Sequence, residues 1–198
     1  CFYLWNVLCQ RLAVGNLCRT MVGAAIPLVV TGGFHVDGFM DTMDALRSYG
    51  TKEKKLEILK DSHIGAFALI CACCYLLLYL AVCTELEPTW EACNFIGLGY
   101  ILCRTLSGLS IVRLRCAKTS GLAATFANNA DKKGVTILLL LWLLVVVALL
   151  FYLNWLWAIC GLVVAALCFA YYRWLAYSKF GGINGDLAGW FLQLLELN

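Results

Sequence analysis

The sequence predicts an all-α fold: a polytopic bundle of transmembrane helices with short cytoplasmic helices between the spans. Apolar residues make up 63% of the 198 residues, and the mean hydropathy is +0.83, far from the composition of soluble domains. Only 14% of the residues are charged. The apolar residues also form stretches long enough to cross a bilayer as helices. Because no repeat or proline-rich linker divides the sequence, we expect residues 1–198 to form a single integral membrane domain.

Five stretches are predicted membrane spans. In chain order they are residues 12–31, 64–84, 91–112, 135–153 and 155–176. Each has about the 20 residues that a helix needs to cross the hydrocarbon core, and the first is the least uniform because it contains Arg19. Residues 186–198 resemble the beginning of a further helix, and the chain starts with Cys1 rather than Met. We therefore expect the sequence to be truncated at both ends.

The basic residues indicate how the chain is oriented. Lys and Arg are concentrated in residues 47–60, 104–118, 132–133 and 173–179, whereas the turn at residues 85–91 is acidic. Because cytoplasmic loops are enriched in Lys and Arg, we expect the basic connections at the cytoplasmic face of a multi-pass protein of the cell membrane. The expected partner is therefore the lipid bilayer. We expect no nucleic-acid partner, and an oligomer remains possible.

The twelve cysteines do not predict a zinc site or a disulfide framework. Most of them lie inside the predicted spans, where a thiol packs as a small apolar group. The cluster around Cys73 is accompanied by neither a second C-x-x-C pair nor a nearby histidine pair that would complete a tetrahedral site.

The polar chemistry is concentrated in one short stretch, GGFHVDGFMDTMDAL, at residues 32–46. Its two glycines predict a break after the first span, and Asp37 is a favourable N-cap for a helix that continues to about residue 48. At about 100° per residue, Asp37, Asp41 and Asp44 share one edge of this helix. The opposite side is apolar. The helix is therefore amphipathic, with an anionic edge at the membrane surface.

Three neighbouring carboxylates favour a bound cation. At about 6 Å each pair repels by roughly 3 kcal/mol at an effective dielectric constant near 20, and Asp37 and Asp41 have no basic residue three or four positions later. Oxygen ligands suit Mg²⁺ or Mn²⁺ better than zinc, and Mg²⁺ usually completes its shell with water and substrate phosphates. We infer a metal-bound phosphate or pyrophosphate. The alternative is an ordinary solvated acidic face.

Two further residues near this stretch have open interpretations. Asp61, in the motif LKDSHIG before the second span, is either a fourth metal ligand or the N-cap of that span. His35 suits a general base that accepts a proton from an attacking hydroxyl, but a structural histidine at a helix start fits equally well. Its direction is unpredictable because of the preceding glycines.

A polyanionic substrate also needs cationic and polar partners. Arg104 lies within a predicted span and should point into the bundle, at the acids or at phosphate, because a guanidinium that faces lipid is costly. Lys118 follows in the next basic loop. In the motif GGINGD, Asn184 and Asp186 either contact phosphate or cap a helix. For the remaining lysines, a topological role is preferred: they are Lys52, Lys54, Lys55, Lys132 and Lys133.

Taken together, these motifs resemble the cobalamin synthase family, the adenosylcobinamide-GDP ribazoletransferases. The matching pieces are TGGFHVDGFMDTMDAL (31–46), KKLEILKDSHIGAFA (54–68), SGLAATFA (120–127) and GGINGDLAG (181–189). The resemblance implies a Mg²⁺-dependent membrane enzyme of the last step of coenzyme B12 synthesis. Its substrates would be adenosylcobinamide-GDP and α-ribazole, or α-ribazole 5′-phosphate, and GMP would be released.

The resemblance maps the family's metal-binding acids onto Asp37, Asp41 and Asp44, with Asp61 as the fourth, and the other roles come from the residues themselves. We expect the metal ligands to be Asp37, Asp41, Asp44 and Asp61, the catalytic residues to be His35, Asp44 and Asp61, and the substrate-binding residues to be Arg104, Lys118, Asn184 and Asp186. The sequence departs from the family pattern at Ala45, where many members have Gly, and at Asn184, where Thr is frequent. Neither departure changes the acidic residues.

Two other functions are less consistent with the sequence. A CDP-alcohol phosphotransferase of lipid synthesis also uses spaced aspartates, but here Phe34 stands where the first acid belongs and Asp41-Thr42 where Ala-Arg belongs. A cation-coupled transporter or ion channel would place acids near the middle of spans, whereas these acids are predicted at one face.

Overall fold

The computed structural model describes residues 2–61, 63–117 and 121–197 and confirms the predicted all-α class. Within these residues the elements are α-helices and one π-helical turn, with no β-strand. The elements are α1 (Phe2–Arg11), α2 (Asn16–Thr31), α3 (Phe34–Arg47), α4 (Lys52–Ile58), α5 (Ala66–Glu85), α6 (Trp90–Arg113), α7 (Leu122–Asn129), α8 (Lys132–Leu153), α9 (Trp155–Leu175), η1 (Ala176–Phe180) and α10 (Gly185–Leu197).

Four of the predicted spans are helices long and apolar enough to cross a membrane. They are α5, α6, α8 and α9 extended by η1, so the chain is a multi-pass membrane protein. The stretch predicted as a fifth span differs. It forms the 16-residue helix α2, which is joined to α3 at an angle of 88° and passes as a span only together with α3. Residues 2–11 form a further helix, α1, that was not predicted.

The bend between α2 and α3 is made by Gly32 and Gly33. Their φ angles of 63° and 74° lie in the left-handed region, where glycine has no steric penalty. Gly32 ends α2, with its N–H bonded to carbonyls of the last turn, and Gly33 is the N-cap of α3. The chain therefore starts a new helix immediately after the old one ends.

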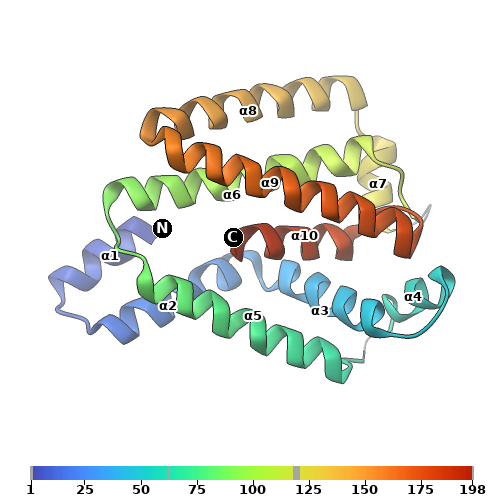
Figure 1. The fold of residues 1–198 in the computed structure, drawn as a ribbon, viewed down its shortest axis with the longest axis horizontal. Coiled ribbons are helices and arrows are strands. Elements are labelled where there is room, and N and C mark those ends of the chain that lie inside the picture. Colours follow the sequence, from blue (N-terminus) through green and yellow to red (C-terminus); the bar gives the residue numbers. More distant parts are fainter. Residues whose placement is uncertain (1, 62, 118–120, 198) are drawn as a thin grey trace.

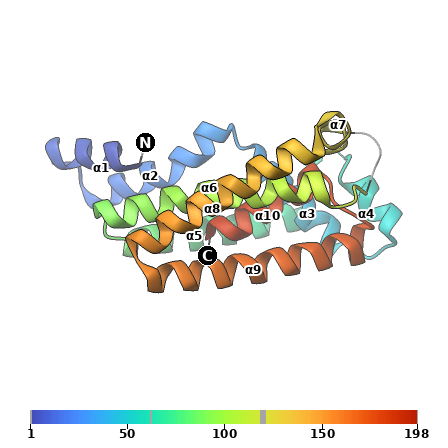
Figure 2. The ribbon, with the colours of Figure 1, turned by 90° about the horizontal axis from the view of Figure 1, so that it is seen from above.

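The helices form a bundle around α10. Figure 1 shows α6, α8 and α9 on one side and α3 and α5 on the other, with α10 between them. Figure 2 shows α1 and α2 at one edge of the bundle and α9 at the opposite edge. The short helices α4 and α7 lie at the same end as the connection from η1 to α10 (Figure 1). We call this the basic end, because residues 113–117, 132–133 and 179 are at or near it.

The core is centred on α10 and the helices that enclose it. Leu187 and Phe191 of α10 are fully buried, and the ring of Phe191 stacks on that of the buried Tyr172 of α9 at 4.7 Å between centroids. A helix that is apolar on most sides is expected to lie inside a protein. The short α10 therefore carries its few polar side chains into the interior.

Helix α4 is fixed to α3 by one buried lysine. The Lys55 side chain is nearly inaccessible, and its Nζ donates to the carbonyl oxygens of Ala45 at 2.7 Å and Ser48 at 2.6 Å. A cation at these carbonyls at the end of α3 satisfies backbone acceptors and complements the helix dipole. Burial and the charge of Lys179 lower the pKa of Lys55 from its ordinary value. Lys55 therefore has a structural role, whereas the other four lysines of that group are exposed.

Candidate functional site

Helix α3 carries all three aspartates of the predicted anionic edge, but it starts earlier than expected. Its N-cap is Gly33, so Asp37 lies in the first turn and is not the cap. The reason is the left-handed backbone of Gly33, which begins the helix four residues earlier than an Asp37 cap would allow. Asp37 still lies where the helix dipole favours a negative charge.

Asp41 lies at the centre of a group of carboxylates. Its side chain is half-buried, and the charges that act on it are those of Asp37, Asp186 and Asp44. Asp186 comes from the first turn of α10, far away in the sequence. We call Asp37, Asp41, Asp44 and Asp186 the acidic cluster.

Two glycines bring α10 close enough to α3 to form this cluster. A Cβ atom on Gly38 would lie 2.9 Å from the backbone oxygen of Asp186, and one on Gly189 would lie 3.1 Å from the backbone oxygen of His35. Real Cβ atoms do not approach backbone as closely as the first of these contacts. The close crossing, and with it the position of Asp186, therefore depends on Gly38.

Asp44 binds the start of helix α5. Its Oδ2 accepts a hydrogen bond from the Gly65 N–H at 2.6 Å, and its Oδ1 accepts one from the Ala68 N–H at 2.8 Å. These amides are among the unpaired donors of a helix N-terminus. A Cβ atom on Gly65 would overlap the Asp44 carboxylate. Glycine is therefore needed where α3 and α5 meet.

Asp61 is not the N-cap of α5, because Asp44 supplies that contact and Gly65 is the cap residue. Asp61 instead pairs with His63: its Oδ1 lies 2.6 Å from His63 Nδ1 and accepts the His63 N–H at 3.1 Å. These bonds lower the pKa of the Asp61 carboxyl from its ordinary value. Both side chains are largely exposed. The structure thus places Asp61 with His63 and not in the acidic cluster.

His35 lies on a different side of α3 from the aspartates. The helix continues back through Phe34, and at about 100° per residue this places His35 about 160° from Asp37. Its Nδ1 is buried and has no hydrogen-bond partner among the described residues. The charged side chain that acts on the imidazole is Arg104. This position does not bring His35 beside the aspartates of α3.

Arg104 points into the bundle, as predicted, but its partner is not one of the aspartates. Its Nη1 donates to Oε1 of Glu196 in α10 at 2.7 Å, and the Glu196 side chain is only 4% exposed. Gln193 Nε2 donates to the other carboxylate oxygen at 3.2 Å. Sequence reasoning missed Glu196, although an acid in an otherwise apolar helix is a signal of an interior partner.

The motif GGINGD forms the start of α10. Asn184 is buried, and its Oδ1 accepts the Leu187 N–H at 2.8 Å, so the capping alternative holds for this residue. Its Nδ2 donates to Asp186 Oδ2 at 3.2 Å and orients that carboxylate. Lys118, a predicted substrate-binding residue, lies outside the described residues.

The acidic cluster fits magnesium in its donor chemistry. None of the ion pairs between described residues includes Asp37, Asp41 or Asp44. Within the same part of the chain, no three His, Cys, Asp or Glu side chains form a ready-made metal cage, so the expected four-aspartate set is not assembled. Mg²⁺, however, usually takes one or two carboxylates and completes its shell with water and substrate phosphates. Asp41, together with Asp37 or Asp186, supplies two carboxylates.

Comparison with known proteins identifies one family. The model of the family described as cobalamin-5-phosphate synthase matches residues 1–198. An adenosylcobinamide-GDP ribazoletransferase of Lachnoclostridium phytofermentans is 41% identical over 196 residues, which cover 99% of this chain and 74% of that relative. A protein of the same name from Clostridium perfringens strain SM101 is 35% identical, covering 98% of this chain and 77% of the relative. One from Listeria welshimeri is 34% identical over 176 residues. No solved structure matches the chain.

Proposed function

This chain belongs to the cobalamin-5-phosphate synthase family, and we propose that it is an adenosylcobinamide-GDP ribazoletransferase. It transfers the adenosylcobinamide-phosphate group from adenosylcobinamide-GDP to α-ribazole or α-ribazole 5′-phosphate and releases GMP. The products are adenosylcobalamin or its 5′-phosphate, at the last step of nucleotide-loop assembly. The observation that carries this proposal is the acidic cluster at the crossing of α3 and α10, in a chain whose whole length matches the family.

The proposed reaction needs charge compensation at a diphosphate. The hydroxyl oxygen of α-ribazole forms a bond to the phosphorus that carries cobinamide, the bond from this phosphorus to the bridging oxygen breaks, and GMP leaves with that oxygen. The hydroxyl proton is released. We propose Asp41, with Asp37 or Asp186, as the side chains that would hold Mg²⁺ there. The ion, when bound, neutralises the phosphate oxygens and stabilises GMP as a leaving group.

The protein itself holds the carboxylates in fixed positions. Helix α10 brings Asp186 against α3 through the contact at Gly38, and the bonds from Gly65 and Ala68 to Asp44 fix α3 relative to α5. Fixed carboxylates can hold a phosphate-bound cation in one geometry, which is the main contribution of a protein to phosphoryl transfer. We propose Asp44 as a positioning residue for Asp41.

The site is proposed to face the cytoplasm from the cell membrane. Apart from Arg11 and Arg19 of α1 and α2, most basic residues belong to the connections at the end that carries α4 and α7, and this end is expected inside the cell. Substrates that carry large polar groups would reach the acidic cluster from this water-facing side. The two alternative functions, a CDP-alcohol phosphotransferase and a cation-coupled transporter, gain no support from the comparisons.

Release of GMP tests the proposal directly. The purified protein with adenosylcobinamide-GDP, α-ribazole and Mg²⁺ should release GMP, and removal of Mg²⁺ with EDTA should stop it. Asp41→Asn should abolish turnover without a change in thermal unfolding, whereas Asp131→Asn, at the start of α8, should retain it. If CDP-diacylglycerol and an alcohol yield CMP while no GMP is formed, the proposed reaction is wrong.

A further inference from the structure

A large cavity in the described part of the molecule lies away from the acidic cluster, between α6, α8 and α9. Its volume is about 1040 Å³, at the upper end of the usual range of about 300–1,000 Å³ for ligand pockets. All three helices that form it are long enough to span a membrane. The cavity, here called the α6–α8–α9 groove, is therefore formed at the depth of the bilayer.

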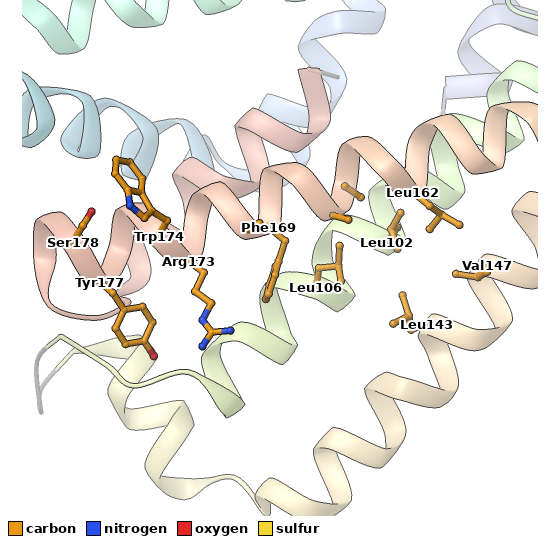
Figure 3. Close-up of a pocket in the computed structure, with 13 residues that line it drawn as sticks. Leu102, Leu106, Leu143, Val147, Leu162, Phe169, Arg173, Trp174, Tyr177 and Ser178 are labelled. Atoms are coloured by element: carbon orange, nitrogen blue, oxygen red, sulfur yellow. The ribbon is translucent and has the colours of Figure 1, made fainter.

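The groove is apolar along most of its length. Leu102 and Leu106 line it from α6, Leu143 and Val147 from α8, and Leu162 from α9 (Figure 3). Small residues on α9 leave the space open, and they are Ala165, Ala166 and Ala170. Such a wall suits hydrocarbon and offers no hydrogen bond to a polar ligand.

Polar side chains line one end of the groove only. Arg173, Tyr177 and Ser178 lie there, and Figure 3 shows the Arg173 guanidinium and the Tyr177 ring directed to the same side of α9. At 1.5 Å per residue, Arg173 lies about 27 Å along α9 from Trp155, close to the full thickness of a hydrocarbon core of about 30 Å. The polar end of the groove is therefore at the level of lipid head groups.

The guanidinium of Arg173 is available to a ligand. It is exposed, and it makes no hydrogen bond or ion pair with any residue that the structure describes. The π-helical turn η1 follows directly and presents Tyr177, whose hydroxyl accepts the Arg115 N–H at 2.9 Å. The Tyr177 hydroxyl hydrogen remains for a further acceptor. Single π-helical turns of this kind are frequent at functional sites.

We propose that the α6–α8–α9 groove binds one anionic phospholipid of the leaflet at the basic end. Its phosphate pairs with Arg173 and accepts a hydrogen bond from Tyr177, and an acyl chain lies along Leu106, Leu143 and Leu162. The match rests on the order of side chains along the groove. The Arg173 cation and the Tyr177 hydroxyl lie at head-group depth, and a continuous apolar wall follows at hydrocarbon depth. A second copy of the chain could occupy the polar end of the groove only by placing an acidic side chain at head-group depth.

Native mass spectrometry of the protein with phosphatidylglycerol or phosphatidylcholine tests this site. Wild type should retain one phosphatidylglycerol more tightly than phosphatidylcholine. Arg173→Gln should weaken the binding of phosphatidylglycerol by about fivefold, which is the effect of one basic residue near an anionic leaflet. The binding of phosphatidylcholine should not change. Lys133→Gln removes a charge at the same end but outside the groove, and should have less than half that effect. Equal losses in the two variants would overturn the proposal.

Variants that fill the groove distinguish a bound lipid from other occupants. Ala166→Phe should reduce retention of both lipids, and Val163→Phe, on the same helix but outside the groove, should reduce neither. A wild-type dimer that Ala166→Phe dissociates, with lipid retention unchanged, would show a second copy in the groove and contradict the lipid. A photoreactive acyl chain on phosphatidylglycerol should crosslink wild type to α6, α8 or α9. Crosslinks confined to other helices would also contradict it.

Discussion

At the scale of single residues, the three aspartates of α3 follow one edge of a helix but have different surroundings. Asp37 is exposed, Asp41 is half-buried among carboxylates, and Asp44 accepts hydrogen bonds from two backbone amides of α5. A carboxylate that satisfies the amides of a helix start is held in place by them. We therefore expect the contribution of Asp44 to appear mainly as stability and that of Asp41 mainly as activity.

Replacing Asp44 tests this division. Asp44→Ala should lower the free energy of unfolding by about 1–3 kcal/mol, because the Gly65 and Ala68 amides lose their acceptor. Asp44→Asn keeps one acceptor oxygen and should lose less. Unfolding in mixed micelles with increasing SDS measures the change. Asp37→Ala removes an exposed carboxylate and should stay within about 0.5 kcal/mol of wild type. An Asp44→Ala protein as stable as this control would rule out the contact with α5.

At the scale of elements, the site depends on how α3 and α10 cross. Helix α10 is short and enclosed by α3, α6, α9 and part of α5. Its first turn carries Asp186, and its last turn carries Glu196, which pairs with Arg104 of α6. The ion pair fixes one end of α10, and the contact at Gly38 fixes the other. Both ends must be in place for Asp186 to lie beside Asp41.

Gly38→Ala tests the importance of this crossing. The added Cβ meets backbone atoms of Asp186, which do not move as easily as a side chain, so α10 must shift from α3. A displacement of about 1 Å at a reacting centre can reduce turnover about 100-fold, and we expect a loss of that order in GMP release. Gly97→Ala in α6, where a Cβ meets no atom within 4 Å, is the matched control and should keep wild-type activity. Similar rates of GMP release in the two variants would show that the crossing of α3 and α10 tolerates the added Cβ.

At the scale of the whole molecule, charge and helix order give the bundle two distinct ends. The turn between α5 and α6 carries Glu87 and has no basic residue, whereas the connections at the other end are basic. In a membrane, this asymmetry determines which end faces the cytoplasm. The acidic cluster and the head-group end of the α6–α8–α9 groove then lie nearer the same leaflet.

An inserted epitope tests this orientation. A short tag placed after Gly50, between α3 and α4, should react with antibody in inverted membrane vesicles and not in intact spheroplasts. A tag placed after Glu87 should show the reverse pattern. Both positions are exposed turns, so neither insertion disturbs a helix. The opposite labelling pattern would place the site on the outer face and exclude a cytoplasmic reaction.

Much of the architecture is predictable from sequence because hydropathy is a local property. Four long spans and the shared edge of Asp37, Asp41 and Asp44 depend on spacing within one helix. The contacts between helices depend on tertiary packing, which spacing does not encode. Asp186 joins Asp41 through a crossing at two glycines. The Asp44 bonds to α5 take the place of the cap that was one of the two interpretations of Asp61.

Lys55 shows the same limit for a single side chain. The neighbouring lysines, Lys52 and Lys54, are exposed, and the spacing of these lysines gives no reason to separate Lys55 from them. Only the approach of α4 to the end of α3 buries its amine among carbonyl oxygens. The sequence therefore predicts that charges are present at this end, and packing decides which of them is structural.

The central position of α10 has a consequence for biosynthesis. Ribosomes make α10 after each of the helices α1 to α9, yet it fills the middle of the bundle and brings Asp186 and Glu196 to their partners. Until α10 emerges from the translocon, Arg104 lies in the membrane without its counter-charge. The earlier helices then have no central helix to pack against. Among helices α1 to α10, the one at the centre is therefore inserted after the helices that surround it.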